Sequence, residues 1–316
     1  KDFSWDTDLN FSTNKNKVKS LAGGVALVGY GQWTDVLTRS AEGDELYAFY
    51  GYKTDGVYTS FEDLISSPVD MRSNSNPVVT NADGTKSWST NPGDYNPKTT
   101  TYIGDVKFVD VNGDGIIDEN DKTKIGSAMP KWTFGWNNTF RYKNLDLTVF
   151  VNGSIGNKVG NYMKMKLTHM NSPWQNQLVD CGNHALLAPK NGQAVDNWYY
   201  DASNVIVTNP DCAYPRASIN DPSDNDVWSD RFIEDGSYLR LKSITLGYTF
   251  DKQLIKKLGL TNLRLTLNAT NLLTITGYDG YDPEIGASTA SQNVYGLDNG
   301  RYPAPTSFTF GLNVSF

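Results

Sequence analysis

The chain has 316 residues, and a hydrophobic fraction of 38% with a mean hydropathy of −0.48 excludes a protein built from apolar transmembrane helices. Acidic residues exceed basic ones by seven charges and the isoelectric point is near 4.9, which argues against nucleic acid as a partner. Glycine, tyrosine and tryptophan are abundant, as in proteins with many turns and aromatic girdles.

The first predicted strand spans residues 2–11, where Phe3, Trp5 and Leu9 alternate with polar side chains. No charged leader, apolar signal segment or cleavage site precedes it. Because a native N-terminus seldom begins inside a strand, we expect residues 1–316 to be the C-terminal portion of a longer protein. Residues 18–30, a glycine-containing run after a polar turn, fit no single pattern.

Five further strands are predicted before the last segment of the chain. The first of them covers residues 46–52. Residues 132–142 and 145–154 are separated by only Lys143 and Asn144, so they are predicted to form a tight hairpin. Residues 238–250 and 263–273 follow, again with apolar and polar side chains in alternation.

The last segment, residues 306–316, shows the clearest alternation in the chain. Its apolar positions are Phe308, Phe310, Leu312, Val314 and Phe316, and the residues between them are small or polar. A period of two places one side of a strand against apolar surroundings and the other against water. Transmembrane barrels are built from segments of about ten residues with this pattern, apolar toward lipid and polar toward the lumen.

The connections between the predicted strands alternate in length. Lys143-Asn144 is short, and residues 251–262 form a compact connector with Asp251 as helix N-cap and Gly259 as its stop. Residues 53–130, 155–236 and 276–305 are long and polar. Short turns at one end and long loops at the other are typical of outer-membrane barrels, whose long loops lie outside the cell.

We therefore predict an all-β fold, the C-terminal portion of a large antiparallel transmembrane β-barrel with long extracellular loops and short periplasmic turns. Rows at Leu145, Leu147 and Val149 and at Leu263, Leu265 and Leu267 would face lipid. Three alternatives remain open. They are a soluble calcium-stabilised all-β carbohydrate-binding module, a β-rich glycoside hydrolase with two carboxylates in one cleft, and a complete barrel of about eight strands.

Several stretches, in this order, resemble the C-terminal third of SusC/RagA-type TonB-dependent transporters, the outer-membrane nutrient importers of Bacteroidetes. They are Phe3-Ser4-Trp5 with residues 14–18, then 50–58, 104–118, 130–135, 235–242, Asn271-Leu272, 281–284 and the closing strand 308–316. The resemblance implies an outer-membrane location and contact with the lipid bilayer. It also implies a plug domain that meets TonB, a SusD-like surface lipoprotein as lid, and an oligosaccharide or peptide as cargo. The plug and the N-terminal strands are absent from residues 1–316, so the missing part must be supplied for transport.

The segment from residue 110 to residue 121 fits a twelve-residue calcium loop, with glycine at its sixth position. Closely spaced carboxylates repel each other unless a cation neutralises them. We therefore predict a structural Ca²⁺ that stiffens a loop, and an acidic turn without an ion is the alternative. The predicted ligands are Asp110, Asn112, Asp114, the carbonyl of Ile116, Asp118 and Asp121.

Cys181 and Cys212 lie in the same long predicted loop. In an exported protein two cysteines favour a disulfide, which is our prediction for this pair. Free thiols are the first alternative. A zinc site that begins with Cys181 and His184, with His169 nearby in the sequence, is the second.

Aromatic side chains of the long loops are candidate cargo contacts, because flat rings bind the CH faces of sugars. Packing of the loops against one another is the alternative role for each of them. Catalysis has no motif in its favour, and we predict that the protein is not an enzyme; Asp282-Pro283-Glu284 is expected to stabilise a loop through backbone contacts. The candidate contacts are Trp174, Trp198, Tyr199, Tyr200, Tyr278 and Tyr281, with Tyr295 beside them.

Overall fold

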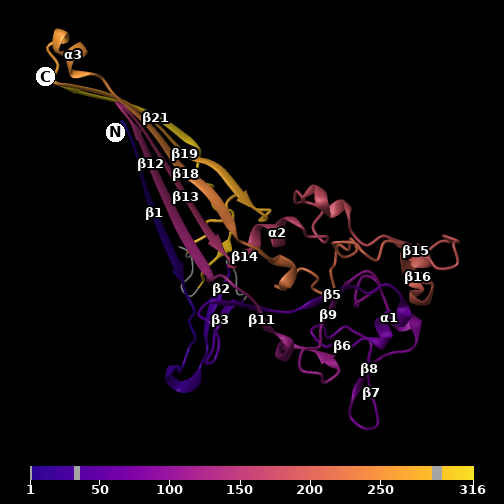
Figure 1. The fold of residues 1–316 in the computed structure, drawn as a ribbon. Coiled ribbons are helices and arrows are strands. Elements are labelled where there is room, and N and C mark those ends of the chain that lie inside the picture. The colour runs from indigo at the N-terminus through magenta and orange to yellow at the C-terminus, as the bar shows by residue number, and fades with distance from the viewer. Residues whose placement is uncertain (1, 32–35, 287–293) are drawn as a thin grey trace.

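The computed structural model describes residues 2–31, 36–286 and 294–316. Six of the seven predicted strands form one antiparallel sheet, in the order β1-β12-β13-β18-β19-β21 (Figure 1). Their bounds are β1 Phe3–Thr13, β12 Trp132–Tyr142, β13 Leu145–Ile155, β18 Tyr238–Thr249, β19 Asn262–Thr276 and β21 Ser307–Ser315. No helix in the described ranges is long and apolar enough to cross a membrane.

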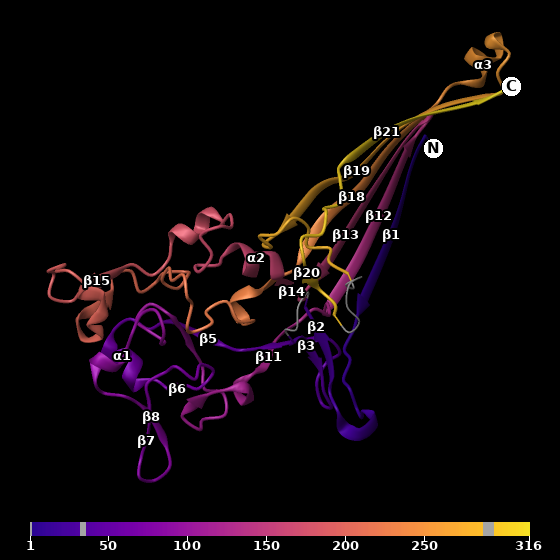
Figure 2. The ribbon, with the colours of Figure 1, turned by 180° about the vertical axis from the view of Figure 1, so that it is seen from behind.

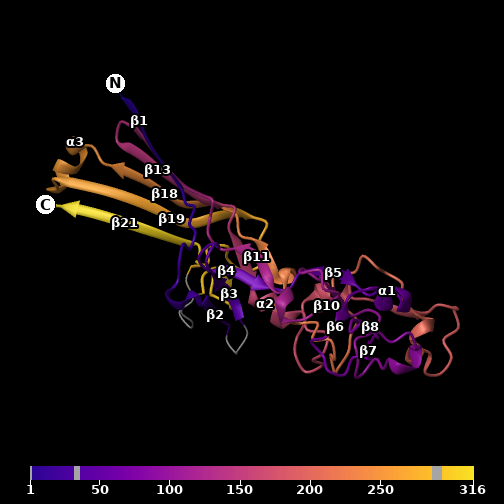
Figure 3. The same cartoon turned by 90° about the horizontal axis from the view of Figure 1, so that it is seen from below.

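The two ends of the sheet differ, as the connection lengths predict. The chain termini, the β12–β13 turn and the helix α3 lie at one end, and the long connections gather at the other (Figures 1 and 2). The turn at Lys143-Asn144 is confirmed, since Tyr142 pairs directly with Leu145. Strands β1 and β21 are the two edges of the sheet, and within the described residues each pairs on one side only (Figure 3).

The strand register aligns apolar side chains of neighbouring strands in rows on one face of the sheet. The opposite face carries polar rows at the alternate positions. One of them runs through Asp6, Thr139, Thr148, Thr245, Asn268 and Thr309. One apolar row runs through Trp5, Phe140, Leu147, Leu246, Leu267 and Phe310. It is not sealed by another layer: Trp5 is 55% exposed, Leu267 49% and Phe310 70%. An uncovered apolar face opposite a polar one is the arrangement expected of a barrel wall.

A β-bulge at Lys242 keeps the apolar side chains of β18 on a single face. Leu241 pairs with Val151 and Ser243 pairs with Phe150, so Lys242 has no partner on β13. The bulge explains why Leu241 and Ile244, which are an odd number of residues apart, both belong to the apolar face.

The long connections are folded and contain short strands and helices, although their composition is polar. They join β1 to β12 (residues 14–131), β13 to β18 (156–237) and β19 to β21 (277–306), and together they are called the loop body here. Its largest hydrophobic cluster brings residues 57–103 of the first connection against residues 185–207 of the second. Leu64, Tyr102 and Val205 in that cluster are at most 1% exposed. Burying each large apolar side chain contributes about 1.5–3 kcal/mol, enough to order such connections.

Short strands and helices frame the loop body. One four-stranded sheet contains β2 Leu27–Tyr30, β3 Val36–Ser40, β4 Ala48–Gly51 and β11 Thr123–Ser127. A three-stranded sheet contains β14 Lys158–Asn161, β17 Ile233–Asp235 and β20 Leu297–Asp298. The remaining strands pair as β5 Thr54–Val57 with β9 Val106–Phe108, β6 Val69–Asp70 with β10 Ile116–Ile117, β7 Val78–Thr80 with β8 Lys86–Trp88, and β15 Leu187–Pro189 with β16 Val205–Val207. The helices are α1 Phe61–Ser66, α2 Tyr162–Leu167 and α3 Lys252–Ile255.

The strand predicted at residues 46–52 forms, but it belongs to the loop body and not to the six-stranded sheet. It is also shorter than predicted. The positive φ of Tyr47 (57°) ends the extended run before Ala48, and Gly51 lies so close to Trp228 that a Cβ would be 2.6 Å from its carbonyl oxygen. Residues 18–30, for which no element was predicted, contain β2.

The compact connector at residues 251–262 is helical, as predicted, and Gly259 ends it with a φ of 73°. Asp251 precedes α3, but its side chain makes no capping hydrogen bond. Ile255 is the buried residue of this turn, whereas Leu254 and Leu258 are 61% and 71% exposed.

Candidate binding site

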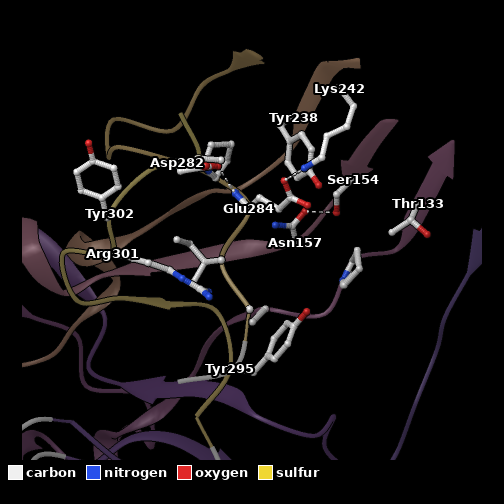
Figure 4. A pocket seen from close by; sticks show the side chains of 16 residues that line it. Thr133, Ser154, Asn157, Tyr238, Lys242, Asp282, Glu284, Tyr295, Arg301 and Tyr302 are labelled. Atoms are coloured by element: carbon white, nitrogen blue, oxygen red, sulfur yellow. Dashed lines mark hydrogen bonds and ion pairs between the residues drawn. The ribbon is translucent and has the colours of Figure 1, made fainter. Parts of the chain in front are cut away.

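A cavity of about 630 Å³ lies where the polar face of the sheet meets the loop body (Figure 4). Strands β12, β13 and β18 form one side of it, and the connection from β19 to β21 forms the other. The cavity is therefore on the side of the sheet that is opposite to the apolar rows. Its lining is Ala128, Pro130, Thr133, Ser154, Asn157, Tyr238, Lys242, Asp282–Gly286, Tyr295, Arg301, Tyr302 and Ala304.

An ion-pair network anchors the last connection to the sheet beside this cavity. Arg240 of β18 is 3% exposed, and its guanidinium donates to Asp282 at 2.5 Å and to Glu284 at 2.8 Å. The third guanidinium nitrogen, Nε, donates to Thr274 Oγ1 at 2.9 Å. Lys242 adds a second cation to Glu284, at 2.9 Å. A buried charge with every nitrogen engaged holds its partners in one arrangement.

Asp282 also organises the backbone of the connection. Its carboxylate accepts from the amides of Glu284 (3.0 Å) and Ala304 (3.1 Å), so the sequence-based expectation of backbone contacts is met. Burial alone would raise the pKa of Asp282, but the hydrogen bonds from Arg240 and from these amides outweigh it, and the pKa is lowered. The carboxylate therefore stays ionised around neutral pH.

The polar face carries a second ion pair, farther from the cavity. Arg264 of β19 reaches across β18 and donates to both carboxylate oxygens of Asp146 on β13, at 2.6 and 2.8 Å. The residue between them is Gly247, and a Cβ there would lie 2.7 Å from Asp146 Oδ2. Glycine at this position leaves the space that the bridge occupies.

The predicted aromatic contacts are dispersed over the loop body, and the structure does not bring them together in one site. Trp174 is 92% exposed. Trp198, Tyr199 and Tyr200 form a small aromatic group, with the two tyrosine rings 4.5 Å apart, and Trp198 also packs against the largest hydrophobic cluster.

The aromatic residues of the last connection have three different settings. Tyr278 is 5% exposed, and its hydroxyl donates to Asp298 at 2.6 Å, so it packs the connection itself. Tyr281 is 70% exposed and lines a second cavity, of about 250 Å³. Tyr295 lines the large cavity and stacks at 6.5 Å on Tyr47.

The predicted calcium loop is ordered by hydrogen bonds from its own backbone. Asp110 accepts from Gly113 and Gly115 at 2.6 and 2.8 Å, and Asp121 accepts from Val111 and Asp118 at 2.9 and 2.8 Å. Ligands that are all oxygen atoms suit a hard cation such as Ca²⁺. Each carboxylate oxygen that accepts one hydrogen bond still has a lone pair with which to coordinate the cation. Within the described ranges, however, no three His, Cys, Asp or Glu side chains are arranged to hold a metal ion, so calcium stays a prediction.

The remaining predicted ligands there are engaged locally as well. Asn112 accepts from the amide of Asp114, and Asp114 accepts from the amide of Ile116. Asp118 accepts from Asn120 at 2.7 Å and begins a one-turn helix, residues 119–121, with a capping box.

Cys181 and Cys212 are both free, so the predicted disulfide is not formed in this structure. The two side chains pack in different surroundings. Cys181 is buried, with its Sγ 3.7 Å from the carbonyl of Leu167, and Cys212 packs against the largest hydrophobic cluster. The zinc alternative finds no support either, because Nδ1 of His184 lies 2.9 Å from the carbonyl of Cys181, and Nδ1 of His169 lies 2.5 Å from Asp226.

Of the residues that line the large cavity, sequence reasoning named only Tyr295 as a candidate contact and Asp282-Pro283-Glu284 as loop stabilisers. The alternation of Ile244, Leu246 and Tyr248 in the sequence would place Arg240 on the apolar face, and only the bulge at Lys242 turns it to the polar face. No signal in the sequence pairs Arg240 with Asp282, which lies 42 residues away.

A comparison with models of protein families gives no match. Among curated proteins, TonB-dependent receptor P3 of Formosa agariphila is 32% identical over 328 residues, and TonB-dependent receptor P26 of the same organism is 30% identical over 325. TonB-dependent receptor SusC of Bacteroides thetaiotaomicron is 24% identical over 322 residues. The alignments include 99–100% of the chain but only 25–27% of these relatives, so the chain spans about a quarter of their length.

Among solved structures, the RagAB peptide importer in its open-open state matches the whole chain with a TM-score of 0.60 and 20% identity, over 27% of the matched chain. The RagAB peptide transporter matches with a TM-score of 0.58 and 19% identity, over 28% of the matched chain. At these identities the likeness concerns the fold alone.

The similar proteins are named as receptors and transporters, not as enzymes. The order of motifs, the two-faced sheet and the matches over the full chain agree with one another. Over its whole length the chain is therefore similar to TonB-dependent outer-membrane receptors, and it fits the C-terminal part of the β-barrel of the SusC/RagA family.

Proposed function

We propose that this chain supplies six wall strands and the outer loop body of a TonB-dependent importer that takes up an oligosaccharide or a peptide. The observation that carries the proposal is the two-faced sheet, with uncovered apolar rows on one side and the large polar cavity on the other. Lipid would contact the apolar rows, and cargo would move past the polar face and contact the cavity. The names of the relatives, which include a receptor SusC and a peptide importer, agree with this role.

The proposed assembly has further members. A SusD-like surface lipoprotein would cover the loop body, and a plug domain outside residues 1–316 would engage TonB. The test uses the full-length protein, purified in detergent from its own outer membrane. We expect it to co-purify with a lipoprotein and to retain an oligosaccharide or peptide that mass spectrometry identifies. Cells that lack the protein should lose growth on that compound as sole carbon source.

The rival is a soluble carbohydrate-binding module. A soluble module would have to cover the apolar row through Leu267 and Phe310 or expose it to water. Both residues are about half exposed or more, so the row is not covered. Recovery of the full-length protein from the soluble fraction without detergent would favour this rival and contradict the importer.

Calcium in the loop at residues 110–121 is a separate proposal, based on the spacing of its oxygen donors. The full-length protein, stripped with a chelator, should become more sensitive to protease in this loop, and added Ca²⁺ should restore protection, while Mg²⁺ should not. The matched control is the hairpin of β7 and β8, whose cleavage should not respond. Equal cleavage of the calcium loop with and without the chelator would count against a bound ion.

A further inference from the structure

We propose that the large cavity recognises a carboxylate group of the cargo, and that Arg301 is the residue that binds it. The proposal rests on the proposed importer function and narrows its cargo to acidic oligosaccharides or peptides with a free carboxylate. The structure contributes three observations, which concern charge, geometry and the neighbouring rings.

The first observation is that one basic residue of the cavity lining has no acidic partner. Arg240 and Lys242 are paired with Asp282 and Glu284. Arg301 also lines the cavity, and within the described residues its guanidinium has no ion pair. Residues 287–293, which lie outside the described ranges, contain no Asp or Glu in their sequence. Counted together with Arg240, which pairs with the two lining carboxylates, the charged residues here leave one positive charge over, in a chain whose net charge is −7.

The second observation is the position of this charge. Arg301 extends toward the cavity from the connection opposite β18, while Lys242 and Glu284 lie together on the sheet side (Figure 4). A guanidinium offers parallel N–H donors that match the two oxygens of a carboxylate, and this pairing is stronger and more directional than that of an ammonium.

The third observation is that two tyrosines line the same cavity as the arginine. Tyr295 and Tyr302 line the same cavity, and Tyr302 is 85% exposed. Exposed tyrosine rings offer apolar faces for the CH face of a sugar or for a peptide side chain next to the carboxylate. A guanidinium and tyrosine rings in one cavity suit a ligand that combines an acidic group with an apolar surface.

The test measures binding to the full-length protein in nanodiscs with two matched pairs of probes. One pair is a trimer of galacturonic acid and its methyl ester, and the other is a tripeptide with a free or an amidated C-terminus. The wild-type protein should bind the acid of at least one pair about tenfold more tightly than its neutral form, as a charge-assisted hydrogen bond allows. The pair that shows the preference identifies the source of the carboxylate.

Three variants decide whether Arg301 is responsible. Arg301→Gln should abolish the preference, and Arg301→Lys should retain only part of it, because the ammonium lacks the fork. Arg39→Gln, which removes a charge outside the cavity, should leave it unchanged. An Arg301→Gln protein that keeps the preference, or a wild-type protein that binds neither acid more tightly than its neutral form, would overturn the proposal. Uptake of a neutral cargo would leave the importer function intact in that case, so the two proposals fail separately.

Discussion

Gly247 occupies the gap through which Arg264 and Asp146 pair across β18. Gly247→Val should place side-chain atoms in that gap, separate the ion pair and lower the stability of the sheet by roughly 1–3 kcal/mol. The loss is measurable as a lower temperature at which the full-length barrel unfolds on a heated gel. Gly277→Ala is the matched control, because a Cβ there meets nothing within 4 Å. Equal shifts for both variants would contradict the role given to Gly247.

Asp221 of the loop body supplies a pH dependence. Burial, with the nearby charges of Asp226 and Asp105, raises the pKa of Asp221 to about 6, against hydrogen bonds from Asn225 that lower it. An acid whose pKa is higher in the folded state binds its proton more tightly there. Above pH 6 the ionised carboxylate of Asp221 therefore lowers the free energy of unfolding. This destabilisation is relieved as the pH falls from about 6 toward the unfolded pKa of 3.8, because the folded protein then takes up the proton.

We therefore expect the segment around Asp221 to become more protected from hydrogen exchange between pH 7 and pH 5, by at most about 1.4 kcal/mol, because about one pH unit of the window is crossed. Asp221→Asn should raise protection at pH 7 and remove the pH dependence. Asp211→Asn, an exposed carboxylate of the same connection, is the control and should retain the wild-type profile. Protection that falls on acidification in the wild-type protein would refute this assignment.

At the scale of elements, Arg240 links strand β18 to the last connection. Arg240→Gln removes the counter-charge of the buried Asp282, a change that typically costs about 3–5 kcal/mol. We expect residues 276–286 to become accessible to protease in the full-length protein while the sheet persists. The double variant Arg240→Met with Asp282→Asn should recover part of the protection, since it leaves no unpaired charge. No recovery in the double variant would show that charge compensation is not the cause.

The bulge at Lys242 sets the side-chain parity of β18. Deleting Lys242 would remove the bulge and reverse which face each residue before it points to. Leu239 and Leu241 would then lie on the polar face. We expect the full-length deletion variant to be absent from the outer-membrane fraction, whereas Lys242→Ala should assemble at the wild-type level. Normal assembly of the deletion variant would mean that the bulge can migrate to a neighbouring residue.

The strands of the six-stranded sheet could be predicted because a period-two alternation can be recognised from residues that are adjacent in the sequence. Strand β12 has the predicted bounds, and the Lys143-Asn144 turn follows from its length. The loop body could not be predicted, because its strands are only two to five residues long and its core joins distant segments, such as those of Tyr102 and Val205. The cavity depends on the same long-range closure, since Asp282 meets Arg240 only after the last connection folds back on the sheet.

At the scale of the whole molecule, the distribution of buried surface differs from that of a soluble protein. The large buried side chains, including Tyr58 and Leu64, lie mainly in the loop body, and the sheet leaves its apolar rows uncovered. Stability of the loop body thus depends on its own cores, while that of the wall depends on surrounding lipid and on neighbouring strands.

The two margins of the sheet, β1 and β21, have a practical consequence. Each presents a row of main-chain amides and carbonyls that find no partner strand among residues 2–31, 36–286 and 294–316. If residues 1–316 were produced alone, they would self-associate through these two strand edges and through the apolar face of the sheet. Affinities measured on such aggregates would not report the cargo preference of the proposed importer.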